Sequence, residues 1–260
     1  MMSKPVIHSI EDKVGIIELA RPEKFNCLSL EVITAIDEAR SEFESKGDVR
    51  AILIRAQGKH FCTGADLDAV KNLLQKETEL DAFIGFGQAA LMRLEACPLP
   101  VVVAVQGLCL AGGIELMLCA DICFAAESAQ IGDQHAQFGL IPGWGGSQRL
   151  TRLLGLRRAL DLFFSARWMK SQEAQAAGLV NYVVEDDKLN DQAMAYCKTL
   201  ATRSRVGLAE MKRLARDGLD LSLAASMRLE RDSAVRVLQG ADAAEGLAAF
   251  EARRTPEFKQ

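Results

Sequence analysis

The stretch PVVVAVQGLCLAGGIELMLCADI, residues 100–122, decides how this chain must be interpreted. It lies inside an apolar segment, residues 97–126, whose only strongly polar members are Gln106, Glu115 and Asp121. Such a segment is long enough to cross a bilayer. Two carboxylates inside a span would each cost roughly 2.5–3.5 kcal/mol, however, and its prolines and glycines break the helix that a span requires. We therefore expect a buried core segment, with a reason for burying Glu115.

Inside this stretch the pattern predicts a strand from Pro100 to Val105, a glycine turn and a short buried helix from about Gly113. Upstream, the alternation of apolar residues predicts a hairpin, and Ser29 is a typical N-cap for an amphipathic helix. Downstream, strands become rare and helical periodicity dominates. The expected strands are residues 6–10, 14–19, 49–55 and 179–184, and the expected helices are residues 30–44, 78–95, 146–154, 156–164, 171–177, 187–203, 206–216, 221–238 and 241–253.

The strand, strand, helix rhythm of the first part predicts an α/β fold built as a spiral of such turns. We expect a core over residues 1–190 and a helical C-terminal region over residues 191–260. The helical region is too small to hold much core alone, so it should pack on the core or on a neighbouring subunit.

Composition narrows the classes of function. The 260 residues carry a formal net charge of −4, which argues against a protein that coats nucleic acid but leaves an anionic small ligand open. The seven cysteines form no CxxC pair, which favours buried thiols in a reducing compartment over disulfides or a zinc site. The first residues lack the apolar run of a signal peptide, so a cytoplasmic location is expected.

Two glycine-containing loops follow buried strands and share a chemistry. They read GKHFCTGADL, residues 58–67, and QGLCLAGGIEL, residues 106–116. In each, small residues expose backbone N–H groups beside a helix start, which suits a partial negative charge. Neither loop has the spacing of a dinucleotide-binding or P-loop motif. Close packing of strand and helix is an equally good explanation from spacing alone.

These motifs carry a family resemblance. The central stretch, with FCTGADL (61–67) ahead of it and AQIGDQHAQFGLIPGWGGSQRLTRLLG (129–155) behind it, resembles the crotonase, or enoyl-CoA hydratase/isomerase, superfamily. RPEKFNCLS near the N-terminus, AQAAGLVNYVV after the core and AFEARRTPEFK at the end fit the same order. The resemblance implies a crotonase-type spiral of β-β-α turns with a C-terminal helical region for trimerisation. The implied assembly is a homotrimer or a dimer of trimers.

The resemblance also implies a mechanism. An acyl-CoA thioester would place its carbonyl oxygen in an oxyanion hole formed by the backbone N–H groups of Ala65 and Gly112. Hydratases of this family use two glutamates around a water, one as the base and one as the acid that protonates the α-carbon. The first falls on Glu115 and the second falls on His135, where the standard hydratase has Glu.

The histidine leaves several interpretations open. Glu115 and a protonated His135 would hold one transferable proton between them, as two neighbouring carboxylates do, so a hydratase is physically reasonable. His135 could equally be an inert wall residue, and Glu115 could be a buried acid satisfied by backbone N–H groups. Acyl-CoA decarboxylation, thioester hydrolysis and acyl-CoA binding without catalysis remain alternatives.

Further residues are assigned to the substrate by family position alone. The implied contacts to the thioester or to coenzyme A involve Lys24, Ala65, Asp66, Leu67, Gly112, Trp144, Phe250, Phe258 and Lys259, the last three through the C-terminal region of a neighbouring subunit. For Trp144 core packing is an equal explanation, and for the terminal residues solvent exposure is. No metal or redox cofactor is expected, and neither nucleic acid nor membrane is an expected partner.

Overall fold

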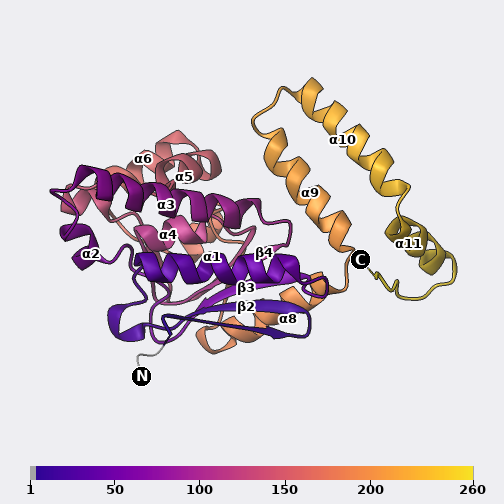
Figure 1. The fold of residues 1–260 in the computed structure, drawn as a ribbon, viewed down its shortest axis with the longest axis horizontal. Helices are drawn as coiled ribbons and strands as arrows, with labels where there is room; N and C mark the ends of the chain where they lie inside the picture. Colours follow the sequence, from indigo (N-terminus) through magenta and orange to yellow (C-terminus); the bar gives the residue numbers. More distant parts are fainter. Residues whose placement is uncertain (1–3, 260) are drawn as a thin grey trace.

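The computed structural model describes residues 4–259, which form two sheets flanked by helices (Figure 1). The large sheet has the strand order β1-β2-β3-β4-β6-β9, with β1 and β2 antiparallel and the other neighbours parallel. The small sheet has the order β5-β7-β8. The strands are β1 Val6–Glu11, β2 Val14–Leu19, β3 Ala51–Ala56, β4 Val101–Val105, β5 Leu108–Leu110, β6 Ile122–Ala126, β7 Gln130–Gly132, β8 Met169–Lys170 and β9 Tyr182–Val184.

The chain repeatedly leaves the large sheet and enters the small one, which produces the predicted spiral. Strand β4 continues into β5, and β6 continues into β7, with one sharp bend in each case. The bend after β4 requires glycine: Gly107 has a φ of +55°, and a Cβ there would lie 2.2 Å from the carbonyl oxygen of Lys59. These paired bends place the ends of β5 and β7 side by side.

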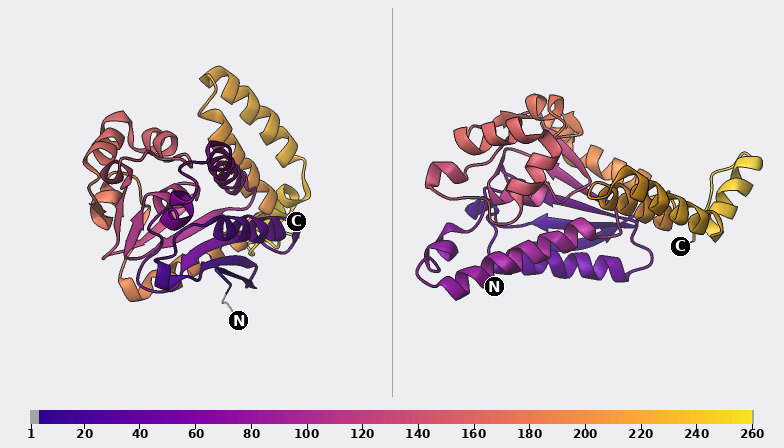
Figure 2. Two further views of the ribbon diagram at one scale, coloured as in Figure 1. Left: turned by 60° about the vertical axis from the view of Figure 1, so that its left-hand side comes forward. Right: turned by 90° about the horizontal axis from the view of Figure 1, so that it is seen from above.

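Helices cover both faces of the large sheet. Helices α1 and α3 pack together on one face and α8 packs on β3 and β4 from the other (Figure 2). The Ser29 side chain accepts the N–H of Val32 and caps α1 as predicted. The helices are α1 Leu30–Ser45, α2 Leu67–Lys71, α3 Glu77–Ala96, α4 Gly112–Met117, α5 Gly146–Leu154, α6 Leu156–Ser165, α7 Ser171–Ala176 and α8 Leu189–Ala201, with 3-10 turns η1 Pro22–Lys24, η2 His135–Phe138 and η3 Asp186–Lys188.

Helices α9 (Arg205–Gly218), α10 (Leu223–Leu238) and α11 (Ala241–Glu251) form an arm that extends beyond the core (Figures 1 and 2). Ion pairs join α9 to the core: Lys212 contacts Asp121 at 2.8 Å, and Arg216 contacts Asp121 and Glu95 at 2.8 and 2.6 Å. The arm exposes many large apolar side chains, namely Met211, Leu219, Leu221, Leu223, Met227, Val235, Leu238, Leu247 and Phe250.

Several local expectations were wrong or incomplete. The strand predicted over residues 179–184 is only β9, because the N–H groups of Leu179 and Val180 both turn back to the carbonyl oxygen of Ala174 at the end of α7. The strands β5, β6 and β7 and the helix α2 were not predicted. Each of these elements has three to five residues, too few for a clear period.

Two glycines of α3 test how tightly this helix packs. A Cβ on Gly87 would lie 2.3 Å from Nε1 of Trp144, whereas a Cβ on Gly85 would meet nothing within 4 Å. We expect Gly87→Ala to lower the free energy of unfolding by about 1–3 kcal/mol, because the buried indole must move. Gly85→Ala, the matched control, should raise it by about 0.5–1 kcal/mol. Urea unfolding measures both, and equal effects would contradict this packing.

Candidate active site

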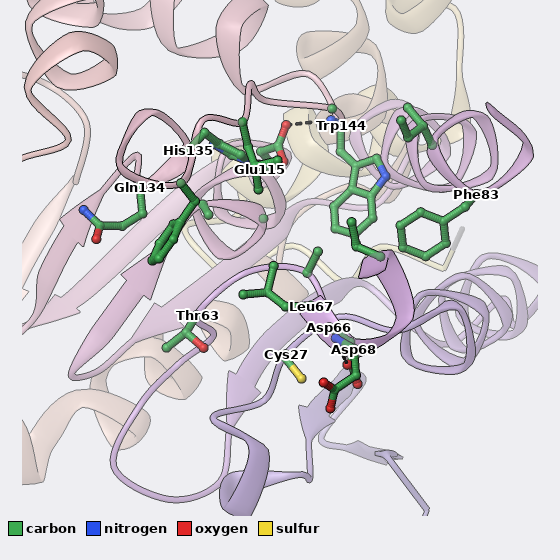
Figure 3. Close-up of a pocket in the computed structure, with 18 of the residues that line it drawn as sticks. Cys27, Thr63, Asp66, Leu67, Asp68, Phe83, Glu115, Gln134, His135 and Trp144 are labelled. Atoms are coloured by element: carbon green, nitrogen blue, oxygen red, sulfur yellow. Dashed lines mark hydrogen bonds and ion pairs between the residues drawn. The ribbon is translucent and has the colours of Figure 1, made fainter. Parts of the chain in front are cut away.

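A cavity of about 790 Å³ opens where the first turns of the spiral meet, between α2, α3, the start of α4 and η2 (Figure 3). It collects most of the residues that the sequence singled out. Those that line it are Lys24, Ala65, Asp66, Leu67, Gly112, Glu115, His135 and Trp144. Candidates far apart in the sequence are thus neighbours in space.

Glu115 lies in the short helix α4 and is only 1% exposed. Its Oε1 accepts the backbone N–H groups of Trp144 at 2.7 Å and Gly146 at 2.9 Å, at the start of α5. Gly146 leaves room for this contact, because a Cβ on it would lie only 3.0 Å from Cγ of Glu115. The carboxylate is therefore fixed by backbone on one oxygen, which leaves Oε2 for chemistry.

Burial raises the pKa of Glu115 above its usual value, and the two N–H groups and the nearby imidazole of His135 only partly oppose this. The pKa of this carboxyl group is thus closer to neutral pH than that of an exposed glutamate. A base with a raised pKa accepts a proton more readily, which suits general base catalysis.

His135 begins the 3-10 turn η2, and Asp133 two residues earlier holds it in place. Asp133 Oδ2 lies 2.9 Å from Nδ1 of the imidazole, and Asp133 Oδ1 accepts the backbone N–H of His135 at 3.1 Å. Burial lowers the pKa of His135, but the Asp133 and Glu115 carboxylates outweigh burial and raise it overall. Sequence reasoning missed Asp133, although its place two residues before a candidate histidine was a usable signal.

The two titratable groups meet across a gap. Nε2 of His135 and Oε2 of Glu115 are 4.0 Å apart, which is too long for a direct hydrogen bond. A small polar molecule with hydrogen bonds of about 2.8 Å to both atoms fits such a separation. The pair can therefore exchange protons with one guest placed between them.

Two backbone N–H groups converge beside this pair. A Cβ on Gly112 would lie 3.1 Å from the backbone nitrogen of Ala65, so the two loops touch at this point. The backbone of Leu28 pairs with the residues on either side of Ala65: its N–H donates to Gly64 and its carbonyl oxygen accepts from Asp66. Gly112 is the first residue of α4, where backbone N–H groups have no partner within the helix. Within residues 4–259, neither the Ala65 N–H nor the Gly112 N–H has a protein acceptor. Both donors are available to a ligand oxygen.

The residue before α4 has an unusual backbone. Ala111 has φ 49° and ψ −117°, a conformation that an L residue with a Cβ rarely adopts. Its own N–H is bound to the carbonyl oxygen of Gly132 in β7 at 3.0 Å. The strained turn sets the direction of the Gly112 N–H, and such strain is typical of functional sites.

The two sides of the cavity differ in chemistry (Figure 3). On the Trp144 side, the indole packs against Phe83 with ring centroids 5.5 Å apart, and Ile84 lies within 4.0 Å of a Cβ built on the adjacent Gly143. Further apolar residues that line the cavity are Val70, Leu74, Leu80, Leu140 and Ile141. On the Cys27 side lie the carboxylates of Asp66 and Asp68, and Lys24, which also lines the cavity, is close enough to act on the Cys27 thiol. Asp66 caps α2 and lies 3.6 Å from Arg21, so it shapes its loop.

The C-terminal candidates lie apart from this cavity within one chain. Figure 1 places α11 at the far end of the arm, on the opposite side of the molecule from α2. Phe250 is 82% exposed there, and Phe258 lies within 4.0 Å of a Cβ built on Gly246 in α11. The expectation that Phe250, Phe258 and Lys259 reach the site of a neighbouring subunit stays a prediction.

The described residues also bear on metal binding, membrane insertion and thiol chemistry. Residues 4–259 contain no group of three or more His, Cys, Asp or Glu side chains arranged to hold a metal ion. No helix among them is both long and apolar enough to cross a membrane. Cys62, beside the first loop, is fully buried as expected, and burial raises the pKa of its thiol to about 12.

Comparisons with known proteins agree with this fold. A family model described as enoyl-CoA hydratase/isomerase matches residues 9–260. A probable enoyl-CoA hydratase of Mycobacterium bovis is 34% identical over 258 residues, covering 99% of both chains, and the mitochondrial methylglutaconyl-CoA hydratase of Rattus norvegicus is 33% identical over 98% of this chain and 82% of that protein. The crystal structure of an enoyl-CoA hydratase from Bacillus anthracis superposes with a TM-score of 0.94 at 30% identity, over 98% of this chain and 99% of the other.

The chain belongs to the enoyl-CoA hydratase/isomerase family, and the predicted crotonase-type α/β spiral is confirmed.

Because Glu115 is buried, its charge should affect the stability of the folded protein in a way that depends on pH. Glu115→Gln keeps an oxygen that can accept both N–H groups and removes a buried charge. Because the pKa of Glu115 is raised in the folded protein, the wild-type protein loses stability as pH rises through the ordinary range of a glutamate. We expect the variant to be at least as stable, with an advantage that grows from about pH 4.5 to about pH 6, where histidine stays largely protonated.

Thermal unfolding of both proteins at several pH values measures this difference. Glu42→Gln, at an exposed carboxylate whose pKa is lowered chiefly by Lys46, is the control and should show no such gain. An advantage of Glu115→Gln that shrinks with rising pH would contradict the raised pKa.

Proposed function

We propose that this protein reversibly hydrates a 2-enoyl-CoA to a 3-hydroxyacyl-CoA, acting as a hydro-lyase. One observation carries the proposal: Oε2 of Glu115 and Nε2 of His135 face each other across 4.0 Å, beside the N–H groups of Ala65 and Gly112, which have no acceptor within residues 4–259. Acid–base chemistry on a thioester needs both features within a few ångströms. The family supports the substrate class.

The geometry suggests the following order of reaction steps. The thioester carbonyl oxygen accepts the N–H groups of Ala65 and Gly112, which stabilise the negative charge that develops as water adds to C3. Glu115 takes one proton from that water, and the imidazolium of His135 gives a proton to C2. The proton on Glu115 then returns to His135, so the pair ends with the single proton with which it began. Losing one oxyanion donor typically costs about 10²–10³ in rate.

The two sides of the cavity suggest how the substrate lies. With the thioester at Ala65 and Gly112, the acyl chain continues along the apolar wall of Trp144, Phe83 and Ile84. Lys24 on the polar side suits a phosphate of coenzyme A. Lys24, near Cys27, is the only Lys or Arg among the described residues that line the cavity, so an uncharged acyl chain is favoured along Trp144.

The exposed apolar residues of α9–α11 support an assembly in which the arm packs on another subunit. We propose a homotrimer or a dimer of trimers, as the resemblance implies. The chemistry above requires no metal or redox cofactor beyond the coenzyme A thioester itself, and we propose that the protein acts in the cytoplasm.

The base assigned to the reaction gives a direct test. Glu115→Gln should lower kcat for hydration of a short 2-enoyl-CoA by about 10²–10⁴, because the amide cannot take a proton from water. The loss of absorbance of the conjugated thioester measures the rate, and Glu42→Gln is the control. Equal rates in the wild-type protein and Glu115→Gln would contradict the assigned role. Release of free thiol would identify thioester hydrolysis instead.

The apolar wall gives a second test. A 2-enoyl-CoA that ends in a carboxylate should show a kcat/KM at least about 10²-fold lower than a methyl-ended substrate of the same length. The reason is that burying an unpaired carboxylate costs several kcal/mol. Steady-state kinetics on the two substrates measures the ratio. A preference for the carboxylated substrate would contradict the proposed orientation.

A further inference from the structure

Asp133 is a buried charge that the proposed reaction does not use directly. It is 1% exposed and lies in the loop between β7 and η2. Its carboxylate spans the backbone N–H and the Nδ1 atom of His135, at 3.1 and 2.9 Å. A buried carboxylate with both oxygens on one histidine constrains the position and the protonation of that ring together.

The contact decides which ring nitrogen carries a proton. An ionised carboxylate only accepts hydrogen bonds, so Nδ1 must be the donor. Nε2 is then the atom that gains or loses a proton, and Nε2 is the atom that faces Glu115. With the opposite tautomer, the ring would present a fixed N–H to Glu115 and could not accept a proton there.

Two charged groups influence the imidazole of His135: Asp133, from its own loop, and Glu115, from α4. Helix α6 also packs against η2, but none of its described residues places a charge near the ring. Behind Glu115 lie Cys119 and Arg149, whose guanidinium is paired with Glu95 at 2.7 Å. Asp133 is therefore the anion in direct contact with His135.

We propose that Asp133 is a positioning residue: it holds His135 as the Nδ1–H form, with Nε2 toward Glu115, and so lets histidine serve as the acid of this site. The proposal rests on the hydration proposed above for its kinetic consequences, but its tautomer can be measured without turnover. Asp133 touches no reacting atom and acts only through the ring.

The kinetic test is a double-mutant cycle between Asp133 and His135. In Asp133→Asn, the amide oxygen can keep the backbone N–H while its NH₂ donates to Nδ1, which locks the neutral Nε2–H form. We expect kcat to fall about 10²-fold with KM little changed, and the alkaline limb of the pH profile to move to lower pH, because the anion that stabilises the imidazolium is gone. On a His135→Gln background, the same change should alter kcat less than about twofold.

Asp186→Asn is the matched control. Asp186 also accepts a backbone N–H, that of Ser128 at 3.1 Å, together with the Ser128 hydroxyl, but it lies outside the cavity. This control should leave kcat and the pH profile unchanged. An Asp133→Asn change that lowers kcat as strongly without His135 as with it would overturn the proposal, because the residue would then act on the fold alone.

The spectroscopic test uses the unliganded protein. Nitrogen-15 NMR of the histidine side chains should show Nδ1 of His135 protonated across the titration of the ring and Nε2 as the titrating atom. The other two histidines, His8 and His60, are internal references, and His135→Gln assigns the signal. In Asp133→Asn, the neutral ring should switch to the Nε2–H form.

A neutral Nε2–H form in the wild-type protein would overturn the proposal, even if Asp133→Asn did not fold. If the wild-type protein hydrates no enoyl-CoA, yet its His135 shows the expected tautomer, the proposed function fails and the positioning role of Asp133 stands. The two failures are therefore distinguishable.

Discussion

The burial of one carboxylate constrains most of this structure. Glu115 is 1% exposed, and it is tolerated there because the N–H groups of Trp144 and Gly146 hold Oε1. Those donors lie at the start of α5, so close that a Cβ on Gly146 would be only 3.0 Å from Cγ of Glu115. The loop that follows η2 thus depends on a residue in α4. A substitution that moved either segment would leave a charge buried without partners.

The spiral brings together the loops that surround Glu115. Strands β4 and β6 of the large sheet bend into β5 and β7 of the small sheet, and Cys62 in the first glycine loop forms a β-bridge with Cys109 in β5, so loops from successive turns stack at one edge. This stacking brings the Ala65 loop against the start of α4, with Gly112 too close to Ala65 for a side chain to fit comfortably. Close backbone packing thus leaves the N–H groups of Ala65 and Gly112 without an acceptor in the described part of the chain. The same small residues therefore serve both packing and the proposed chemistry.

How much of the fold and the site could be predicted from the sequence depends on the length of each element, because a periodic pattern needs several residues to show. The hairpin, α1, β4 and the helices of the arm followed from periodicity, and the motif order indicated the cavity residues. The short strands β5 and β7 did not, since three residues carry no period, although they align the two loops. Asp133 was missed for another reason: its importance lies in a contact to Nδ1, and a sequence does not state where a side chain points.

Histidine in place of the second carboxylic acid changes the charge of the site and hence what must surround it. Two carboxyl groups that share a proton carry one negative charge, whereas Glu115 with an imidazolium carries none. An imidazolium buried without a partner would lose its proton, because burial alone lowers the pKa of His135. Asp133 supplies the missing negative charge on the far side of the ring. The trio of Glu115, His135 and Asp133 then carries one net negative charge, the same as two carboxyl groups that share a proton.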